Sequence, residues 1–232
     1  MAAGTPSRPR AGEEARAHAL ATLRQAILRG DFAPGQRLVE EELAGSLGVT
    51  RQSLRAALLD LTAEGLVERI PNRGARVRVV SAEEAVAITE CRMALEALCA
   101  VKAAQRITDD QAAQLRELAE NLRRSVAEGN PLEYSELNRE LHRRVGVISG
   151  QAVAVGLLER LHAQLVRHQF QLALRPGRPE VSLPEHVAIA HAVAGRRPED
   201  ADRAVRAHLA SVIQALQAGN ATVHEAPAQP KQ

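Results

Sequence analysis

Apolar side chains recur every three or four positions over most of this chain, which is the spacing of helices that bury one face. The clearest run follows Thr50, where Leu54, Leu58 and Leu61 fall on one side of a helix. Thr50 is a good N-cap, because its hydroxyl oxygen can accept a bond from a free backbone N–H. Before residue 81 the pattern predicts three helices, over about 14–29, 40–47 and 50–65. The predicted buried stripe of the first helix is Leu20, Leu23, Ile27 and Leu28.

After Gly65 the chain is predicted to form a hairpin. Leu66–Arg69 and Ala75–Val79 are its two short strands, and Asn72-Arg73-Gly74 is the turn between them. Together with a tight turn at Gly48-Val49, the order is helix, turn, basic helix and basic hairpin. That order is the plan of a winged helix-turn-helix, which places one helix in the major groove of DNA.

From Ser81 onward no strand is predicted. Six helices are expected, over about 82–105, 108–128, 132–149, 152–174, 180–194 and 198–218, with turn or capping residues between them. We therefore expect a mostly α protein, in which a winged helix-turn-helix domain (14–80) precedes an all-helical bundle (81–219). Residues 1–13 and 220–232 are predicted to be disordered tails.

Composition agrees with a helical core and places the basic charge at one end. Aromatic residues make up only 1% of the 232 residues, so the core must consist of Leu, Ala, Val and Ile. The net charge of +2 does not by itself identify a nucleic-acid binder, but residues 1–80 carry 12 Arg against 9 Asp and Glu. The basic residues of this part are concentrated in Arg51, Arg55, Arg69, Arg73, Arg76 and Arg78.

Cysteine usage and hydropathy favour a cytoplasmic protein. Cys91 and Cys99 are eight residues apart in one predicted helix, roughly 12 Å along its axis, which is too far for a disulfide. Buried reduced thiols are the expectation, as in a cytoplasm. No apolar run is long enough to span a membrane, and no signal peptide is evident.

The N-terminal motifs resemble those of the GntR superfamily of bacterial transcription regulators. They read G-x-x-x-P-G-x-x-L, L-A, L-G-V-T-R, L-R-x-A-L, E-G-L-V and N-R-G-A-x-V, and they occur in that order from Gly30 to Val77. Two positions depart from the common pattern: Ala56 stands where Glu is common, and Ser53 where Pro is common. These departures bear on the operator sequence more than on DNA binding itself.

The helical remainder resembles the ligand-binding domain of the FadR-like branch, called FCD. The motifs that carry this likeness are Arg92-x-x-Leu95-Glu96, Asn138-x-x-Leu141-His142, Glu185-His186 and His208-Leu209. The resemblance implies a domain that binds a small molecule and a metal ion.

The predicted DNA contacts lie on the basic helix and on the hairpin. They are Thr50, Arg51, Gln52, Arg55, Arg73, Gly74 and Arg76. An Arg guanidinium can bind guanine through two hydrogen bonds or hold a phosphate, and a glycine backbone can approach DNA closely. The alternative is a solvated basic surface with no partner.

The resemblance also implies a metal site formed by Asn138, His142, His186 and His208. Asn138 and His142 are four residues apart and share a helix face, and the other two come from different helices. Neutral imidazoles suit a divalent transition metal, with Zn as the first expectation and Ni as another. Asn138 stands where Asp is common, so the site would keep the full charge of the metal and attract a carboxylate. The alternative is that these histidines are surface or polar-core groups.

Three further expectations concern single side chains. Arg92 either binds the carboxylate of an effector or pairs internally with Glu96, one helical turn away. His162 and His168 are expected to be exposed or at an interface. Glu185 is the one acidic group beside the predicted metal site that could serve an enzyme as acid or base.

These features favour a homodimeric transcription regulator that is not an enzyme. We expect a repressor that a small anionic metabolite releases from a palindromic double-stranded DNA operator. The first alternative is a metal-dependent enzyme that uses the three-histidine site to activate water. The second is a DNA architectural protein that responds to no ligand, which the large non-basic helical domain disfavours.

Overall fold

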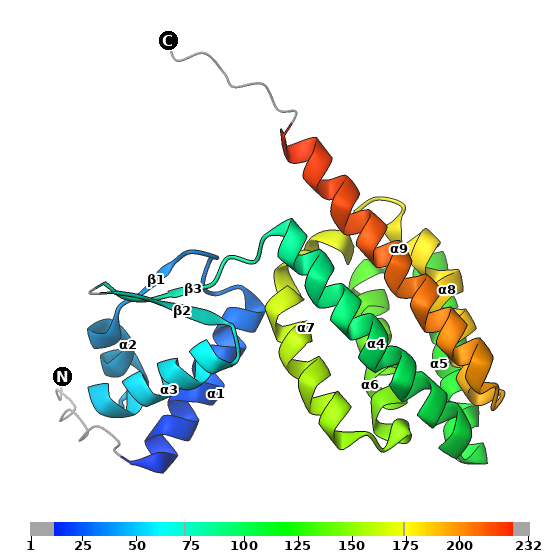
Figure 1. Ribbon diagram of the computed structural model, residues 1–232, viewed down its shortest axis with the longest axis horizontal. Coiled ribbons are helices and arrows are strands. Elements are labelled where there is room, and N and C mark those ends of the chain that lie inside the picture. Colours follow the sequence, from blue (N-terminus) through cyan, green and yellow to red (C-terminus); the bar gives the residue numbers. More distant parts are fainter. Residues whose placement is uncertain (1–11, 72, 174, 225–232) are drawn as a thin grey trace, which may run out of the picture. The chain divides into compact units, whose positions relative to one another are not determined.

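The structure is a computed structural model that describes residues 12–71, 73–173 and 175–224. Over these residues the chain forms nine helices and one three-stranded sheet (Figure 1). It divides into two compact units, Met1–Val80 and Ser81–Gln232. The predicted mostly α fold, a winged helix-turn-helix followed by a bundle of about six helices, is confirmed.

The N-terminal unit has the predicted helices and hairpin together with one strand that was not predicted. Its elements are α1 (Glu13–Arg29), β1 (Arg37–Leu38), α2 (Glu40–Leu47), α3 (Arg51–Ala63), β2 (Val67–Ile70) and β3 (Gly74–Val77). The sheet is antiparallel in the order β1-β3-β2, with Leu38 opposite Ala75. A two-residue strand is too short to show a period, so only its pairing with β3 reveals β1.

The packing of α1 differs from the predicted stripe. Leu23 is buried as expected, but Leu20, Ile27 and Leu28 are only half-buried. The fully buried positions are the alanines Ala15 and Ala19, because small side chains allow α1 to lie close against α3. Alanines carry little apolar surface, so the sequence pattern gave them too little weight.

The connection between α2 and α3 is a tight turn. Gly48 ends α2 with φ +61°, a left-handed conformation that favours glycine. Val49 is buried, and Thr50 caps α3 by accepting a hydrogen bond from the backbone N–H of Ser53. The three predicted core residues of this helix are at most 4% exposed: Leu54, Leu58 and Leu61.

The C-terminal unit is a bundle of six helices. They are α4 (Ala82–Arg106), α5 (Asp109–Ala127), α6 (Pro131–Ser149), α7 (Ala152–Ala173), α8 (Arg178–Ala194) and α9 (Pro198–His224). The last helix continues to His224, although a tail was predicted from residue 220. The rest of the predicted tails, residues 1–11 and 225–232, and Asn72 of the predicted turn lie outside the described residues.

Within the bundle, α4 packs along α9 and against α6, while α8 packs against α5 and α9 (Figure 1). The core is aliphatic, as the composition predicted. Its largest fully buried side chains include Leu115, Leu122, Leu141, Ile189 and Leu209. This packing turns one face each of α4, α6, α8 and α9 toward the interior, where a few polar side chains interrupt the apolar core.

Candidate DNA-binding face and three-histidine site

The predicted DNA contacts of α3 are on the surface of the N-terminal unit. Arg51, Gln52 and Arg55 are exposed, while the leucines of the same helix face the core. Thr50 is half-buried, and its hydroxyl oxygen lies 3.2 Å from the backbone nitrogen of Ser53 that it caps. The cap fixes the start of α3, so the exposed residues of its first two turns project from a defined helix end.

Three more of the predicted DNA contacts lie on the β2–β3 hairpin. Arg73 is exposed, and Gly74 opens β3 with φ +85°, a conformation that an L side chain rarely adopts. Arg76 lies opposite Glu68 in the sheet, with its Nε 2.6 Å from the Glu68 carboxylate. Gly74 is therefore needed for the turn itself, whatever else it contacts.

Both arginines of α3 are paired with carboxylates of α2. Arg51 Nη2 lies 2.5 Å from Glu41 Oε1, and Arg55 Nε lies 2.6 Å from Glu40 Oε2. Beside the second pair is an open hollow of about 540 Å³ between the helices and the hairpin, and Arg69 helps to line it. Arg69 was not among the predicted contacts, although it belongs to the same basic cluster in the sequence.

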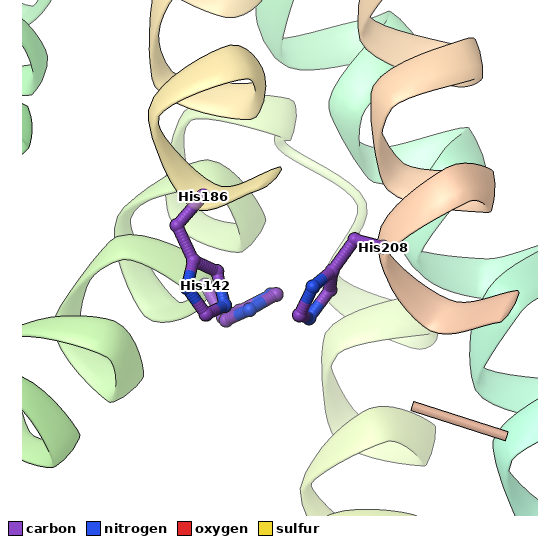
Figure 2. Close-up of side chains that lie close together, drawn as sticks. All are labelled: His142, His186 and His208. Atoms are coloured by element: carbon purple, nitrogen blue, oxygen red, sulfur yellow. The ribbon is translucent and has the colours of Figure 1, made fainter. Parts of the chain in front are cut away.

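The three predicted histidines of the bundle come together. His142 on α6, His186 on α8 and His208 on α9 point their rings toward one another (Figure 2). Each offers a ligand atom, and these atoms lie within 4.8 Å of one another. His186 and His208 are buried, and His142 is half-buried. The spacing is that of a site that can hold one metal ion.

Each of these imidazoles has a polar neighbour at its Nδ1, through a hydrogen bond at His186 and His208 and an ion-pair contact at His142. The Nδ1 of His142 lies 2.9 Å from Glu96 Oε2, and that of His208 lies 2.9 Å from Glu185 Oε2. The Nδ1 of His186 lies 2.8 Å from the hydroxyl of Tyr134. The Nε2 atoms are therefore the ones left to bind a metal.

Three buried polar atoms at this place have no hydrogen-bond partner among the described residues, namely Oε2 of Glu96 and two atoms on the side of the histidines. The latter two are Nε2 of His186 and Oδ1 of Asn138, which is one helical turn before His142. A buried polar atom without a partner is costly unless something binds it. Both atoms are metal-ligand types, so the residues present fit a transition metal, which three imidazoles can hold while leaving coordination positions open.

Burial favours the neutral form of two of these histidines, His186 and His208. Burial lowers the pKa of His186 well below its usual range, and the charges of His208 and His142 lower it further. Burial also lowers the pKa of His208, although its hydrogen bond to Glu185 opposes this. Neutral imidazole is the form that binds a metal.

The Glu96 carboxylate is buried yet ionised. Burial raises its pKa, but the charge of Arg92 and the contacts with His142 and His162 outweigh burial and hold the pKa well below its usual range. Arg92 is 5% exposed and binds Glu96 with its Nη2 2.9 Å from Oε1. The structure therefore places Arg92 in the internal ion pair, which was the alternative to direct effector binding.

The surroundings of the histidines include residues that the sequence did not single out. His162 on α7, expected to be exposed or at an interface, is half-buried with its Nε2 3.3 Å from Glu96 Oε1. Tyr134 and Ser182 are buried and carry no motif. Cys91 is exposed, contrary to the expectation of two buried thiols, whereas Cys99 is buried. Such neighbours are set by helix packing, so a single sequence gives no signal for them.

An exposed basic helix and wing, followed by a helical bundle with a histidine cluster, define a DNA-binding regulator with a ligand-binding domain. Family models agree: "Bacterial regulatory proteins, gntR family" matches residues 15–77, and "FCD domain" matches residues 87–211. The chain therefore belongs to the GntR family of bacterial transcription regulators, in the group with an FCD domain.

Curated relatives are similar over most of their length. The HTH-type transcriptional repressor RspR of Escherichia coli K12 is 28% identical over 194 residues, covering 84% of this chain and 85% of the relative. The HTH-type transcriptional repressor NanR of Cronobacter sakazakii is 30% identical over 223 residues, covering 84% and 83%.

Solved structures share the fold. The Escherichia coli protein McbR/YncC has a TM-score of 0.72 at 20% identity, covering 90% of this chain and 100% of that one. A putative GntR regulator from Rhodococcus sp. RHA1 has a TM-score of 0.70 at 25% identity, covering 89% and 99%. Among the described residues, no helix combines the length and the apolar character needed to cross a lipid bilayer.

Proposed function

We propose that this regulator binds operator DNA through α3 and the wing, using the seven residues predicted from the sequence together with Arg69. The observation that carries the proposal is the exposed group of Arg51, Gln52 and Arg55 on a capped helix in a GntR domain. Arginines on such a helix can read guanine or hold phosphate. Arg69 lines the hollow beside Arg55, so a DNA phosphate could contact both.

We further propose that the bundle holds one divalent transition metal, Zn or Ni, through Nε2 of His142, His186 and His208 with Asn138 as a fourth contact. The support is the convergence of the three imidazoles and the unpartnered atoms of His186 and Asn138. FCD domains often bind metals, and this chain has the histidines in place. Such a metal supplies a Lewis acid for an anionic group of the effector.

In our proposal the protein acts as a dimeric repressor in the cytoplasm. Two relatives, RspR and NanR, are named as repressors. A two-fold dimer matches a palindromic operator, because each recognition helix then reads one half-site. A small carboxylate metabolite would shift the dimer to a form with lower DNA affinity. Arg92 is held by Glu96, so its contribution to effector binding would come through the position of that carboxylate.

The DNA part of this proposal is tested by sequencing the genomic fragments that the purified protein retains at moderate salt. A shared short palindrome that Arg51→Ala, Arg55→Ala protein fails to retain is the expected result. Equal retention by both proteins would show that α3 does not read the operator. Arg206→Ala, which removes an exposed arginine of α9, is the control.

The metal part is tested by elemental analysis of the wild type and of a His142→Ala, His186→Ala variant. About one Zn or Ni per chain in the wild type only is expected. Equal content in both would refute the site. Incubation of the metal-loaded protein with candidate carboxylates then separates the two roles considered for the site. Release from DNA supports a regulator, while chemical turnover of the carboxylate would favour the enzyme.

A further inference from the structure

Hydrogen bonds at His186 and His208 and an ion-pair contact at His142 form an organised outer shell around the three histidines. We infer that Tyr134, Glu96 and Glu185 fix each imidazole with its proton on Nδ1 and its bare Nε2 turned to the metal position. The inference rests on the proposed metal site, and it assigns to this site three positioning residues. It follows from the direction of the hydrogen bonds at His186 and His208 and from the charge of Glu96 beside His142.

The direction is best determined at His186. Ser182 Oγ lies 2.9 Å from the backbone oxygen of Arg178, which can only accept, so the serine donates its single proton there. The Ser182 oxygen then accepts from the Tyr134 hydroxyl, 2.6 Å away. The tyrosine proton is thereby used, so the Tyr134 oxygen accepts from Nδ1 of His186 at 2.8 Å. Neutral His186 therefore carries its proton on Nδ1.

The second ring nitrogen of His186, Nε2, agrees with a proton on Nδ1. Nε2 of His186 is buried and has no hydrogen-bond partner among the described residues. With the proton on Nδ1, this nitrogen has an unused lone pair in a site that His142 and His208 also face. A bare imidazole nitrogen is the form that binds a metal ion.

The two carboxylates act on the remaining rings in the same way. An ionised carboxylate can only accept, so Nδ1 of His208 donates to Glu185 at 2.9 Å. At His142 the Glu96 carboxylate lies in an ion-pair contact of 2.9 Å with Nδ1, and its negative charge favours the proton on that nitrogen. Three partners on three helices thus select one tautomer: Glu96 on α4, Tyr134 on α6 and Glu185 on α8. Helix packing by itself does not require all three partners to favour the same tautomer.

Each carboxylate of this shell is balanced by an arginine. Arg92 Nη2 lies 2.9 Å from Glu96, and Arg178 Nη2 lies 3.7 Å from Glu185. The chains His142–Glu96–Arg92 and His208–Glu185–Arg178 therefore add no net negative charge. A divalent metal bound by neutral rings keeps its charge, so the chemical class of effector that fits is an anion such as a carboxylate.

Outer partners of metal-binding histidines fix the ring and make the ligand nitrogen more basic, and losing one lowers metal affinity about 10- to 100-fold. The full chain, stripped of metal, should be titrated with Zn²⁺ in competition with a chromophoric chelator. Tyr134→Phe, which removes a single oxygen, and Glu185→Gln should each bind Zn²⁺ about 10- to 100-fold more weakly than the wild type. Glu140→Gln, a carboxylate of α6 that pairs with Arg143 and Arg144, should bind like the wild type.

Nitrogen-15 NMR of the imidazoles in the metal-free protein provides the second readout. The wild type should show the proton on Nδ1 of all three histidines, and Tyr134→Phe should show part of His186 with its proton on Nε2. A merely structural tyrosine would leave the tautomer unchanged. If Glu185→Gln fails to fold, the inference is tested by the Zn²⁺ affinity and the His186 tautomer of Tyr134→Phe alone.

The outcomes separate the two proposals. If the wild type binds Zn²⁺ tightly and Tyr134→Phe has the same Zn²⁺ affinity and the same His186 tautomer, the outer shell is overturned. The metal site is then still supported. A folded wild type that binds neither Zn²⁺ nor Ni²⁺ overturns the metal site and the shell together.

Discussion

At the scale of single residues, the arginines proposed to contact DNA already hold carboxylates. Glu41 lies 2.5 Å from Arg51, and Glu40 lies 2.6 Å from Arg55. Exposed ion pairs of this kind contribute at most about 1 kcal/mol, so phosphate or a guanine edge can displace them. The carboxylates keep the guanidinium groups in place, and they also lower the attraction of this surface for DNA of any sequence.

We predict that Arg55→Ala weakens operator binding by about 1–3 kcal/mol and relaxes specificity at one base pair of each half-site. The reason is the loss of a guanidinium that reads bases. Binding is measured by fluorescence anisotropy with operator variants at fixed salt. A loss that is equal for all sequences would instead assign Arg55 to a phosphate.

Glu40→Gln should have the opposite effect on non-operator DNA. Removing the carboxylate frees Arg55, and the affinity for random duplex should rise about two- to fivefold, as expected from the strength of an exposed pair. The comparison is made at several salt concentrations. Glu42→Gln, on the same helix and exposed, is the control and should change the affinity less. An unchanged or lower affinity would contradict the idea that Glu40 and DNA compete for Arg55.

At the scale of elements, two ion pairs hold α1 against α3, and a buried leucine holds α6 in the bundle. Arg16 binds Asp60 through two hydrogen bonds of 2.7 and 2.8 Å, and Arg24 binds Glu64. Leu141 is fully buried in the turn of α6 that separates Asn138 from His142. The same helices that form the cores therefore set the positions of both functional surfaces.

The Arg16–Asp60 pair predicts a dependence of stability on pH. Its hydrogen bonds and charge lower the pKa of Asp60 in the folded state. A lowered carboxyl pKa contributes stability that is complete above the unfolded value, about pH 4, and is lost as the pH falls through the folded value. Thermal unfolding between pH 7 and 3 should therefore show a smaller acid loss in Asp60→Asn than in the wild type. If stability fell equally with pH in both proteins, the Arg16–Asp60 pair would not be a source of the pH dependence.

Leu141→Ala should destabilise the bundle by about 2–5 kcal/mol, because it removes buried apolar surface and leaves a cavity. The matched control is Leu132→Ala on the same helix, where the side chain is 66% exposed. Chemical denaturation measures the difference in the free energy of unfolding. Equal effects of the two substitutions would mean that α6 does not pack as described.

At the scale of the whole molecule, the chain joins a DNA-binding unit to a unit that carries the proposed ligand site, with the division at Val80 and Ser81. A ligand that binds only the folded bundle stabilises that unit by mass action. It can influence DNA binding only if it has different affinities for two forms of the assembled protein. Regulation is therefore a property of the complete chain and not of either unit.

We predict that Zn²⁺ at about 100 times its dissociation constant stabilises the bundle by about 2.7 kcal/mol. In a calorimetric scan the transition of the bundle should move to higher temperature, and a separate transition of the DNA-binding unit should not. Loss of two of the three histidines in the His142→Ala, His186→Ala variant should abolish the shift. A shift that persists in this variant would place the metal elsewhere.

Much of the fold could be predicted from local patterns. The helix from Thr50, the hairpin around Gly74 and the six helices after Ser81 follow from caps, turns and apolar spacing, because these signals act within a few residues. The histidines could be found because family motifs mark them. The strand Arg37–Leu38 and the alanine face of α1 could not, since both depend on a partner that is distant in the sequence.

The sequence by itself determined the class of protein, the elements and the residues with metal-ligand or DNA-binding chemistry. Only the tertiary structure decided what surrounds those residues. It placed Glu96, Tyr134 and Glu185 on the Nδ1 atoms of three histidines, and it paired Arg92 internally. The physical reason is that a hydrogen bond between helices depends on how their faces meet, and that geometry arises from the packing of the whole core.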